Sequence, residues 1–332
     1  MAKKTSKRTA IAFVESPLQF LSALEAHEPD EELLIRARAN AKGMTSFLDA
    51  FDPAWLPERV RLDREGAKPG ILRKVSPQRI YVGDACSGQV HKALSMAYLE
   101  RRMPEIVVLD DGLATYSTIE TLTAKRGPLV RPRQKLKPSR EVMAAYVADR
   151  LRGLANAGRL RWHTALPVPK SLRNAFLRTG GQITRHRFEH LQSLPTGGSH
   201  SRDTPVIGSS LAADGLIREA DYLGWLQGII SDGPITYYPH RRETDEFLAA
   251  LGRDERVRIK HVGLPIELRL INLPADSVIR SLPSTAAVSL AVLNPDVRIE
   301  VTEVPAEWWT GASPDSLRTS LNAQTVTGDD ET

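Results

Sequence analysis

TAIAFVESPLQFLSALEAHE, residues 9–28, is the stretch that indicates the fold of this chain. Its first part, TAIAFVES, is an apolar run typical of a buried strand. The rest, PLQFLSALEAHE, has the apolar spacing of an amphipathic helix, with Pro17 in the first turn, where helices accept proline. A strand that leads directly into a helix is the repeating unit of an α/β protein with a parallel sheet.

The same alternation of apolar runs and helical patterns continues through the first half of the chain. It predicts a parallel sheet with crossover helices, and therefore a Rossmann-like domain over residues 1–195. The segments that carry the pattern are ELLIRAR (32–38), MTSFLDAF (44–51), RIYVGDACSGQVHKALSMAYLERR (79–102) and EIVVLDDG (105–112).

A second α/β series follows a stretch rich in Ser, Gly, Pro and Thr at residues 190–204, which we interpret as a linker. The fold class expected is α/β, with two Rossmann-like domains that face each other across a cleft, the arrangement called GT-B. The second domain is predicted over 204–310, and the polar residues 311–332 are predicted to form a flexible tail. Its predicted segments are TPVIGSSL (204–211), EADYLGWLQGII (219–230), PITYYPH (234–240), TDEFLAALG (244–252), VRIKHVGLP (257–265) and AVSLAVL (287–293).

Bulk composition limits the classes of function. With 332 residues and 41% hydrophobic content, the chain can bury enough surface for two domains. The net charge of +5 is spread over 45 basic and 40 acidic residues, so nucleic-acid binding is not required and an anionic substrate explains the charge equally well. Cys86 is the only cysteine, which excludes an internal disulfide and fits a reducing compartment. We therefore expect a cytoplasmic protein.

Several cofactor and membrane classes are not indicated. The chain has no P-loop and no GxGxxG motif, which argues against an ATPase or a nicotinamide enzyme. Its eight histidines lack the close pairs of zinc sites, so no metal and no cofactor is expected. No apolar stretch approaches the ~20 residues of a membrane span. At most, we expect peripheral contact with the inner face of the membrane.

The motifs of both halves, taken in order, resemble the bacterial sialyltransferase and polysialyltransferase group. The resemblance covers about residues 10–300, and the order of the whole set makes it specific. Enzymes of this group have the GT-B fold and use a CMP-activated nonulosonic acid. The motifs are VESPLQFLSALEA (14–26), YVGDACS (81–87), LDDG (109–112), IGSSL (207–211), YYPHRRE (237–243), GLPIEL (263–268) and SLPSTAA (281–287).

The resemblance implies roles for particular residues. Asp111 would be the general base that deprotonates the acceptor hydroxyl, and His240 would lie against the departing CMP phosphate. Ser284 and Thr285 would bind that phosphate. The family usually has proline after this histidine, whereas Arg241 follows His240 here. No metal ion is implied.

The residues themselves support this chemistry. Asp111 follows a predicted buried strand, and the like charge of Asp110 together with partial burial would raise its pKa toward that of a useful base. Gly112 would let an acceptor approach the backbone. His240 follows the predicted strand ITYYP and can donate to phosphate. The competing interpretations are an ordinary polar turn for Asp-Asp-Gly and a solvated helix start for the histidine segment.

The other candidate contacts lie at predicted helix starts and strand ends. Ser284 or Thr285 would cap a helix whose free amides face an anion, although a simple cap is the commoner explanation. Glu267 would accept hydrogen bonds from ribose, with a surface glutamate as its alternative. Arg241 would grip the carboxylate of the donor. Further substrate-binding candidates are Ser16, Gln19, Asp84, Asp110, Gly208 and Ser209.

A basic segment between Lys125 and Arg140 contains seven Lys or Arg residues and no acid. Such a run is usually a solvated loop. Because it follows the predicted base, it would attract a glycan or another anionic polymer as acceptor, or an anionic membrane surface.

Three alternatives to transfer from a CMP-sialic acid stay open at this point. The donor would be CMP-Kdo or another nonulosonate in the first. The chain would be a UDP-sugar epimerase with the same fold in the second. In the third it would be a non-catalytic protein that binds polyanions through the basic segment.

Overall fold

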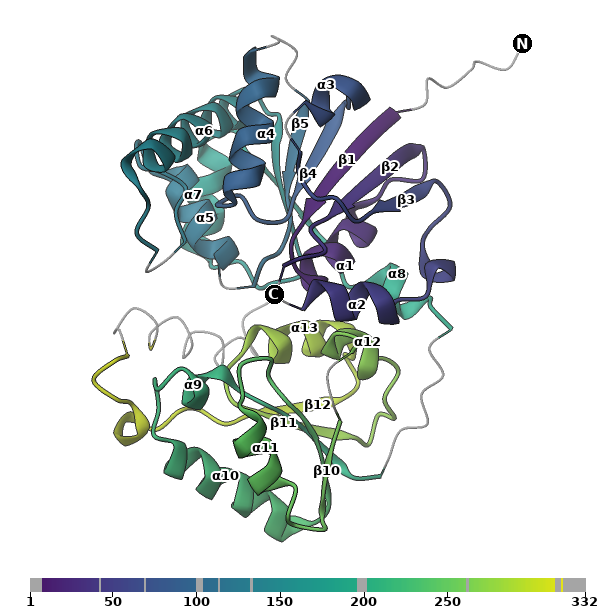
Figure 1. Cartoon of the computed structure of the whole chain (residues 1–332), viewed down its shortest axis with the longest axis vertical. Coiled ribbons are helices and arrows are strands. Elements are labelled where there is room, and N and C mark those ends of the chain that lie inside the picture. The colour runs from purple at the N-terminus through teal and green to yellow at the C-terminus, as the bar shows by residue number, and fades with distance from the viewer. Residues whose placement is uncertain are drawn as a thin grey trace. The chain divides into compact units, whose positions relative to one another are not determined.

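The computed structural model describes residues 8–41, 43–68, 70–99, 104–112, 114–131, 134–195, 202–260, 263–313 and 318. Two units of the chain, Met1–Ser193 and Leu194–Thr332, each build their own fold. Each unit holds one parallel sheet with helices between successive strands (Figure 1).

The sheet of the first unit has seven strands in the order β3-β2-β1-β4-β5-β6-β7. Every paired strand runs parallel to its neighbour. The order reverses direction between β1 and β4, which creates the topological switch point of a Rossmann-like sheet. The strands are β1 (Arg8–Val14), β2 (Glu31–Ala37), β3 (Val60–Asp63), β4 (Arg79–Val82), β5 (Glu105–Val108), β6 (Leu160–Thr164) and β7 (Gln182–Arg185).

Helices cover both faces of this sheet. Ile11 and Phe13 of β1 belong to a buried cluster that includes side chains of four helices, α4 to α7. The rings of Phe20, Phe47 and Phe51 pack edge to face on α1 and α2. The helices are α1 (Pro17–Ala26), α2 (Met44–Ala50), α3 (Ile71–Val75), α4 (Gly88–Leu99), α5 (Ala114–Thr123), α6 (Pro138–Asn156), α7 (Lys170–Arg178) and α8 (Glu189–Gln192), with a 3₁₀ turn, η1 (Pro53–Trp55).

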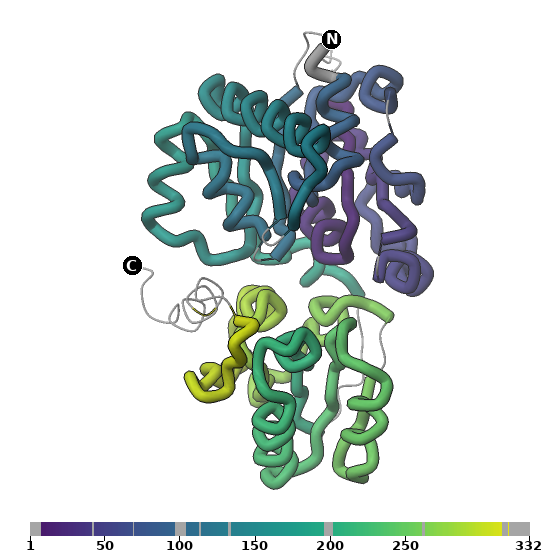
Figure 2. The backbone as a smooth tube through the Cα atoms, turned by 60° about the vertical axis from the view of Figure 1, so that its left-hand side comes forward, coloured from purple at the N-terminus to yellow at the C-terminus, as the bar shows by residue number. Residues whose placement is uncertain are grey.

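The sheet of the second unit has five parallel strands in the order β10-β9-β8-β11-β12, which repeats the switch between β8 and β11. This unit is the green-to-yellow part of the chain in Figure 2. Its strands are β8 (Thr204–Ile207), β9 (Ile235–Tyr238), β10 (Val257–Ile259), β11 (Val278–Ser281) and β12 (Arg298–Val301). Its helices are α9 (Ser210–Ala213), α10 (Glu219–Asp232), α11 (Asp245–Leu251), α12 (Ile266–Arg269), α13 (Thr285–Leu293) and η2 (Ala306–Trp308).

The expectation of two Rossmann-like α/β units is confirmed, and every strand and helix named from the sequence is present. Residues 196–201 of the predicted linker lie outside the described residues, as does most of the predicted tail. The start of that tail packs on the second unit, because the Ser313 hydroxyl is buried and donates to the Leu216 carbonyl at 2.7 Å. Among the described helices, none combines the length and the apolar content needed to cross a bilayer.

Candidate active site

Three carboxylates gather where β1, β4 and β5 of the first unit end, at the switch point. Glu15 follows β1, Asp84 follows β4 and Asp111 follows β5. The carboxyl ends of parallel strands lie on one edge of a sheet, where α/β proteins bind their ligands. Predicted contacts Gln19 and Asp84 and the predicted base Asp111 are thus neighbours in space.

Gln19 connects two of these strand ends. Its Nε2 donates to Asp111 Oδ1 at 2.6 Å, and its Oε1 accepts the backbone N–H of Glu15 at 2.7 Å. Ser16 caps α1 by accepting the N–H of Gln19 at 3.3 Å, so the fold already uses this predicted contact. A Cβ at Gly83 would lie 2.7 Å from Gln19 Cδ, so only glycine leaves room for that amide.

Arg131 supplies the positive charge of this edge. Its Nη2 donates to Asp84 Oδ2 at 2.7 Å and to Asp111 Oδ2 at 3.3 Å. Arg131 belongs to the basic segment, which was expected to attract an acceptor. One residue of that segment therefore already pairs with the candidate base.

The pKa of Asp111 is raised to about 7, chiefly by burial and then by the negative charge of Asp84. Arg131 and the amide of Gln19 lower the pKa and offset part of this rise. The sequence argument assigned the like charge to Asp110, but it comes from Asp84 and, to a smaller extent, Glu15. With 17% of its side chain exposed, Asp111 is reachable by a substrate and half ionised near neutral pH.

Asp110 faces a different part of the unit. Its side chain is 1% exposed, and its Oδ2 accepts the N–H of Ala165 at 2.8 Å, in the loop after β6. Burial raises its pKa to about 6. Because the two neighbouring carboxylates turn toward different partners, they do not form a common chelate. Gly112 has a φ of 64°, a conformation that favours glycine, directly beside the candidate base.

In the second unit, His240 follows β9 and its loop is held by Glu243. The Glu243 carboxylate accepts the N–H of His240 at 2.8 Å, while the N–H of Arg242 points at His240 Nδ1 at 3.3 Å. Glu243 Oε1 also accepts the hydroxyl of Tyr237 at 2.5 Å, so Glu243 is no surface partner of the adjacent arginines.

Gly208 and Ser209 border this buried network. A Cβ at Gly208 would lie 2.5 Å from Glu243 Oε2 and 2.7 Å from the N atom of His240. The N–H of Ser209 donates to the Tyr222 hydroxyl at 3.1 Å, and that hydroxyl lies 2.8 Å from the one of Tyr237. The glycine thus permits close approach of the His240 loop to β8.

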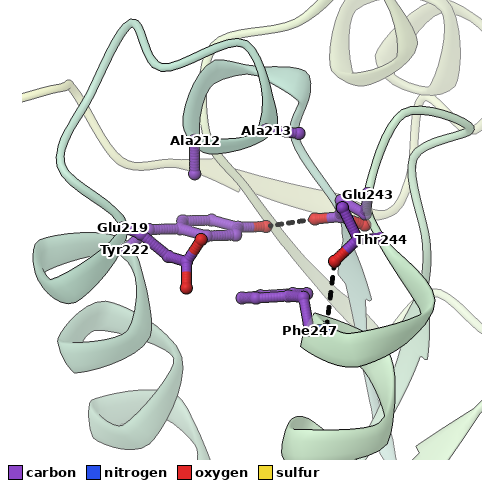
Figure 3. A pocket seen from close by; sticks show the side chains of 7 residues that line it. All are labelled: Ala212, Ala213, Glu219, Tyr222, Glu243, Thr244 and Phe247. Atoms are coloured by element: carbon purple, nitrogen blue, oxygen red, sulfur yellow. Dashed lines mark hydrogen bonds between the residues drawn. The ribbon is translucent and has the colours of Figure 1, made fainter.

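A small pocket opens beside the same network, between α9, α10 and α11 (Figure 3). The rings of Tyr222 and Phe247 stack there with centroids 5.9 Å apart. Arg242 pairs with Asp214 at 2.6 Å, and Arg241 is exposed. The lining residues are Ala212, Ala213, Glu219, Tyr222, Glu243, Thr244 and Phe247.

Ser284 caps α13, as the sequence predicted, by accepting the N–H of Ala287 at 3.1 Å, and Thr285 is the first residue of that helix. The cap follows β11, the strand across the switch point from β8. Glu267 is buried rather than on the surface; burial raises its pKa, and a hydrogen bond from Ser289 partly offsets the rise.

Sequence reasoning did not find the roles of Arg131 and Glu243. A signal for Glu243 was present, since a glutamate three positions after His240 can cap the turn that the histidine begins. Arg131 carried no such signal, because its pairing with Asp84 and Asp111 depends on a long loop.

Comparison with known proteins gives structural likeness alone. No protein-family model matches the sequence, and no curated protein matches it. An α/β-galactoside α-2,3-sialyltransferase from the luminous marine bacterium Photobacterium phosphoreum is similar over 96% of this chain and 95% of its own, with 11% identity and a TM-score of 0.55. A UDP-glucose:anthocyanidin 3-O-glucosyltransferase in complex with UDP is similar over 98% and 91%, with 11% identity and a TM-score of 0.50. The chain has the GT-B fold of two Rossmann-like units.

Proposed function

We propose that this chain is an inverting glycosyltransferase that moves a sialic-acid-like nonulosonic acid from a CMP donor to a hydroxyl of a glycan. The observation that carries the proposal is Asp111, a partly exposed carboxylate at the switch point of the first sheet with a pKa of about 7. The likeness to a sialyltransferase over nearly the whole of both chains supports the choice of donor.

On the acceptor side, Asp111 acts as the general base. It takes the proton of the acceptor hydroxyl as the oxygen attacks the anomeric carbon of the donor sugar, and the bond from that carbon to the CMP phosphate breaks. A pKa near 7 leaves the carboxylate ionised in about half the molecules at neutral pH, while keeping it basic enough to accept the proton. Gln19 fixes the orientation of the carboxylate.

On the donor side, His240 donates a hydrogen bond to the departing phosphate, and the N-terminus of α13 at Ser284 and Thr285 holds that phosphate. A capped helix start presents backbone N–H groups and a positive dipole end to an anion. Glu243 is the positioning residue for His240, because it fixes the backbone N–H of the histidine. Arg241 is exposed and pairs with the sugar carboxylate.

The acceptor is a glycan or another anionic polymer drawn by the basic segment, and the protein works in the cytoplasm, at most at the inner face of the membrane. The CMP donor leaves the phosphate chemistry unchanged if the sugar is Kdo or another nonulosonate. The glucosyltransferase likeness keeps UDP sugars among the donors to test.

The test is a panel of CMP and UDP sugars offered to the purified chain with and without glycan acceptors, followed by measurement of nucleotide release. We expect release of CMP with a nonulosonate donor, a strong fall in Asp111→Asn, and no change in Asp149→Asn, an exposed aspartate on α6. Release of UDP alone would give the donor class to the alternative. No turnover with any sugar would contradict the enzyme proposal.

Two controls separate the remaining alternatives. An epimerase would exchange isotope in a UDP sugar without any acceptor, which a transferase does not require. A polyanion-binding protein would lose binding when the basic segment is neutralised and would be unaffected by Asp111→Asn or His240→Ala.

A further inference from the structure

Three metal-ligating side chains meet in the first unit, away from the strand ends that carry Asp111. Glu25 lies near the end of α1, His186 follows β7, and Glu189 is the first residue of α8. One ligand atom from each lies within 4.8 Å of those from the other two. The chain folds back to join α1 to the β7–α8 connection, so no spacing in the sequence indicates the cluster.

His186 is the observation that points to a ligand. Its side chain is 3% exposed, and among the described residues neither ring nitrogen has a hydrogen-bond partner. Buried polar atoms are almost always paired, because an unpaired one forfeits its hydration without replacement. The ring stacks on His163 with centroids 4.7 Å apart and meets Phe188 edge to face at 4.8 Å, so neighbouring rings restrict its orientation.

The two carboxylates are also held in place. Glu25 accepts the N–H groups of His190 at 3.0 Å and Leu191 at 2.9 Å. Glu189 Oε2 accepts the N–H of Arg187 at 2.9 Å. Each carboxylate oxygen has two acceptor positions, so these bonds leave room for an ion. Two ionised carboxylates this close repel each other, and a bound cation reverses that repulsion.

We propose that Glu25, His186 and Glu189 form a binding site for a divalent transition-metal ion of the Zn²⁺ class. An imidazole nitrogen with two carboxylate oxygens is a donor set for zinc, whereas Mg²⁺ and Ca²⁺ take oxygen ligands alone. Asp110 Oδ2 lies 3.9 Å from His186 Nε2. Metal-bound histidines commonly direct their second nitrogen at a carboxylate, and Asp110 is placed to receive it after a small shift.

The ion would act as a structural link. It joins the end of α1 to the start of α8, and the opposite end of α1 carries Ser16 and Gln19, which contact the edge with Asp111. The ligands do not touch Asp111, so the ion stabilises the first unit and takes no part in the proposed transfer. The site is therefore independent of the proposed function.

The test measures Zn²⁺ binding by the full chain after metal removal with a chelator. Titration calorimetry should give one Zn²⁺ per chain at this site, and thermal denaturation should show a Tm rise of about 5 °C with Zn²⁺ at about 100 times its Kd, but none with Mg²⁺. Glu189→Gln should weaken Zn²⁺ about 100-fold and remove the Tm rise. Glu189 is exposed, so this variant should fold. Glu246→Gln, in the first turn of α11, is the matched control and should bind as the wild type does.

A second measurement uses the unmodified chain. Co²⁺ added to the metal-free protein should produce visible absorption bands that one equivalent of Zn²⁺ removes. Absence of stoichiometric Zn²⁺ binding would overturn the proposal. So would Zn²⁺ binding that Glu189→Gln leaves unchanged, since the ion would then lie elsewhere in the chain.

Discussion

The two units use one topology for opposite electrostatic tasks. Both sheets reverse strand order beside their first strand, at β1/β4 and at β8/β11, and both place candidate residues at the strand ends there. The first unit presents the carboxylates Glu15, Asp84 and Asp111. The second presents an imidazole and a helix N-terminus. The same scaffold therefore offers a base at one switch point and an anion site at the other.

The fate of the acidic residues explains this difference. In the first unit, burial and the charge of Asp84 keep Asp111 basic, and Arg131 only partly compensates. In the second, Glu243 accepts hydrogen bonds from the His240 N–H and the Tyr237 hydroxyl, so its charge serves the loop. One carboxylate is left available for a proton, whereas the other fixes a backbone.

Asp111→Asn should have the largest effect and breaks the comparison if it does not. Loss of a proton-transfer group lowers turnover about 10²- to 10⁴-fold. The amide keeps the oxygen that accepts from Gln19, so the fold should persist. The check is nucleotide release together with the circular dichroism spectrum. Turnover within a few-fold of wild type would remove Asp111 from the base role.

The same variant should be more stable than the wild type above neutral pH. The folded pKa of Asp111 is about 7 against an ordinary 3.8, so the folded state binds the proton more tightly. Stability supplied by that proton is complete at low pH and is lost as the pH rises toward 7. Asparagine avoids this loss, which is at most a few kcal/mol at about 1.4 kcal/mol per pKa unit. Denaturant titrations of both proteins at pH 5 and pH 8 should therefore converge and diverge respectively.

Glycine substitutions test the close packing at each switch point. Gly83→Ala would press on Gln19, and Gly208→Ala on Glu243, so each should cost about 1–3 kcal/mol of unfolding free energy. The first should also reduce turnover through Asp111, and the second through His240. Gly153→Ala and Gly228→Ala in open helical positions are matched controls, expected to gain up to about 1 kcal/mol. Equal stabilities for test and control variants would contradict the packing argument.

Arg131→Gln should change the pH dependence more than the maximum rate. Arg131 lowers the pKa of Asp111, so its removal raises that pKa. The base must be ionised, and therefore the rising limb of rate against pH should move to higher pH. Each unit of displacement lowers the rate on the acid side about tenfold, with recovery at alkaline pH. An unshifted profile would mean that Arg131 does not act on the base.

Much of the fold followed from local patterns, because a parallel strand buried on both faces is a nearly continuous apolar run. ITYYP and EIVV became β9 and β5 for this reason. β7 was not predicted, since its short sequence QITR is polar and its side chains are only partly buried or exposed. The 19-residue helix α6 starts inside the predicted basic loop, where Lys and Arg concealed its apolar face.

The candidate site was predictable only where chemistry and strand end coincide in the sequence. Asp111 and His240 satisfy that condition and could be named. The environment of Asp111 could not, because the Asp84 charge and the Arg131 pairing come from residues 27 and 20 positions away (111 − 84 and 131 − 111). Glu243 looked like a surface residue because its charge lies among arginines, and only the fold shows the hydroxyls of Tyr237 and Tyr222 beneath it.

Ser284→Ala should have the smallest effect and sharpens the contrast between the units. Its hydroxyl caps α13, and loss of such a cap costs about 1 kcal/mol. If the helix start also holds the donor phosphate, the KM for the CMP sugar should rise, while the pH profile set by Asp111 stays in place. Asp52→Ala is the control, because Asp52 caps a turn of the first unit through the N–H of Ala54 at 2.9 Å. Both variants should lose stability, but only Ser284→Ala should weaken donor binding; a matching rise in KM for Asp52→Ala would reduce the donor effect to general loosening.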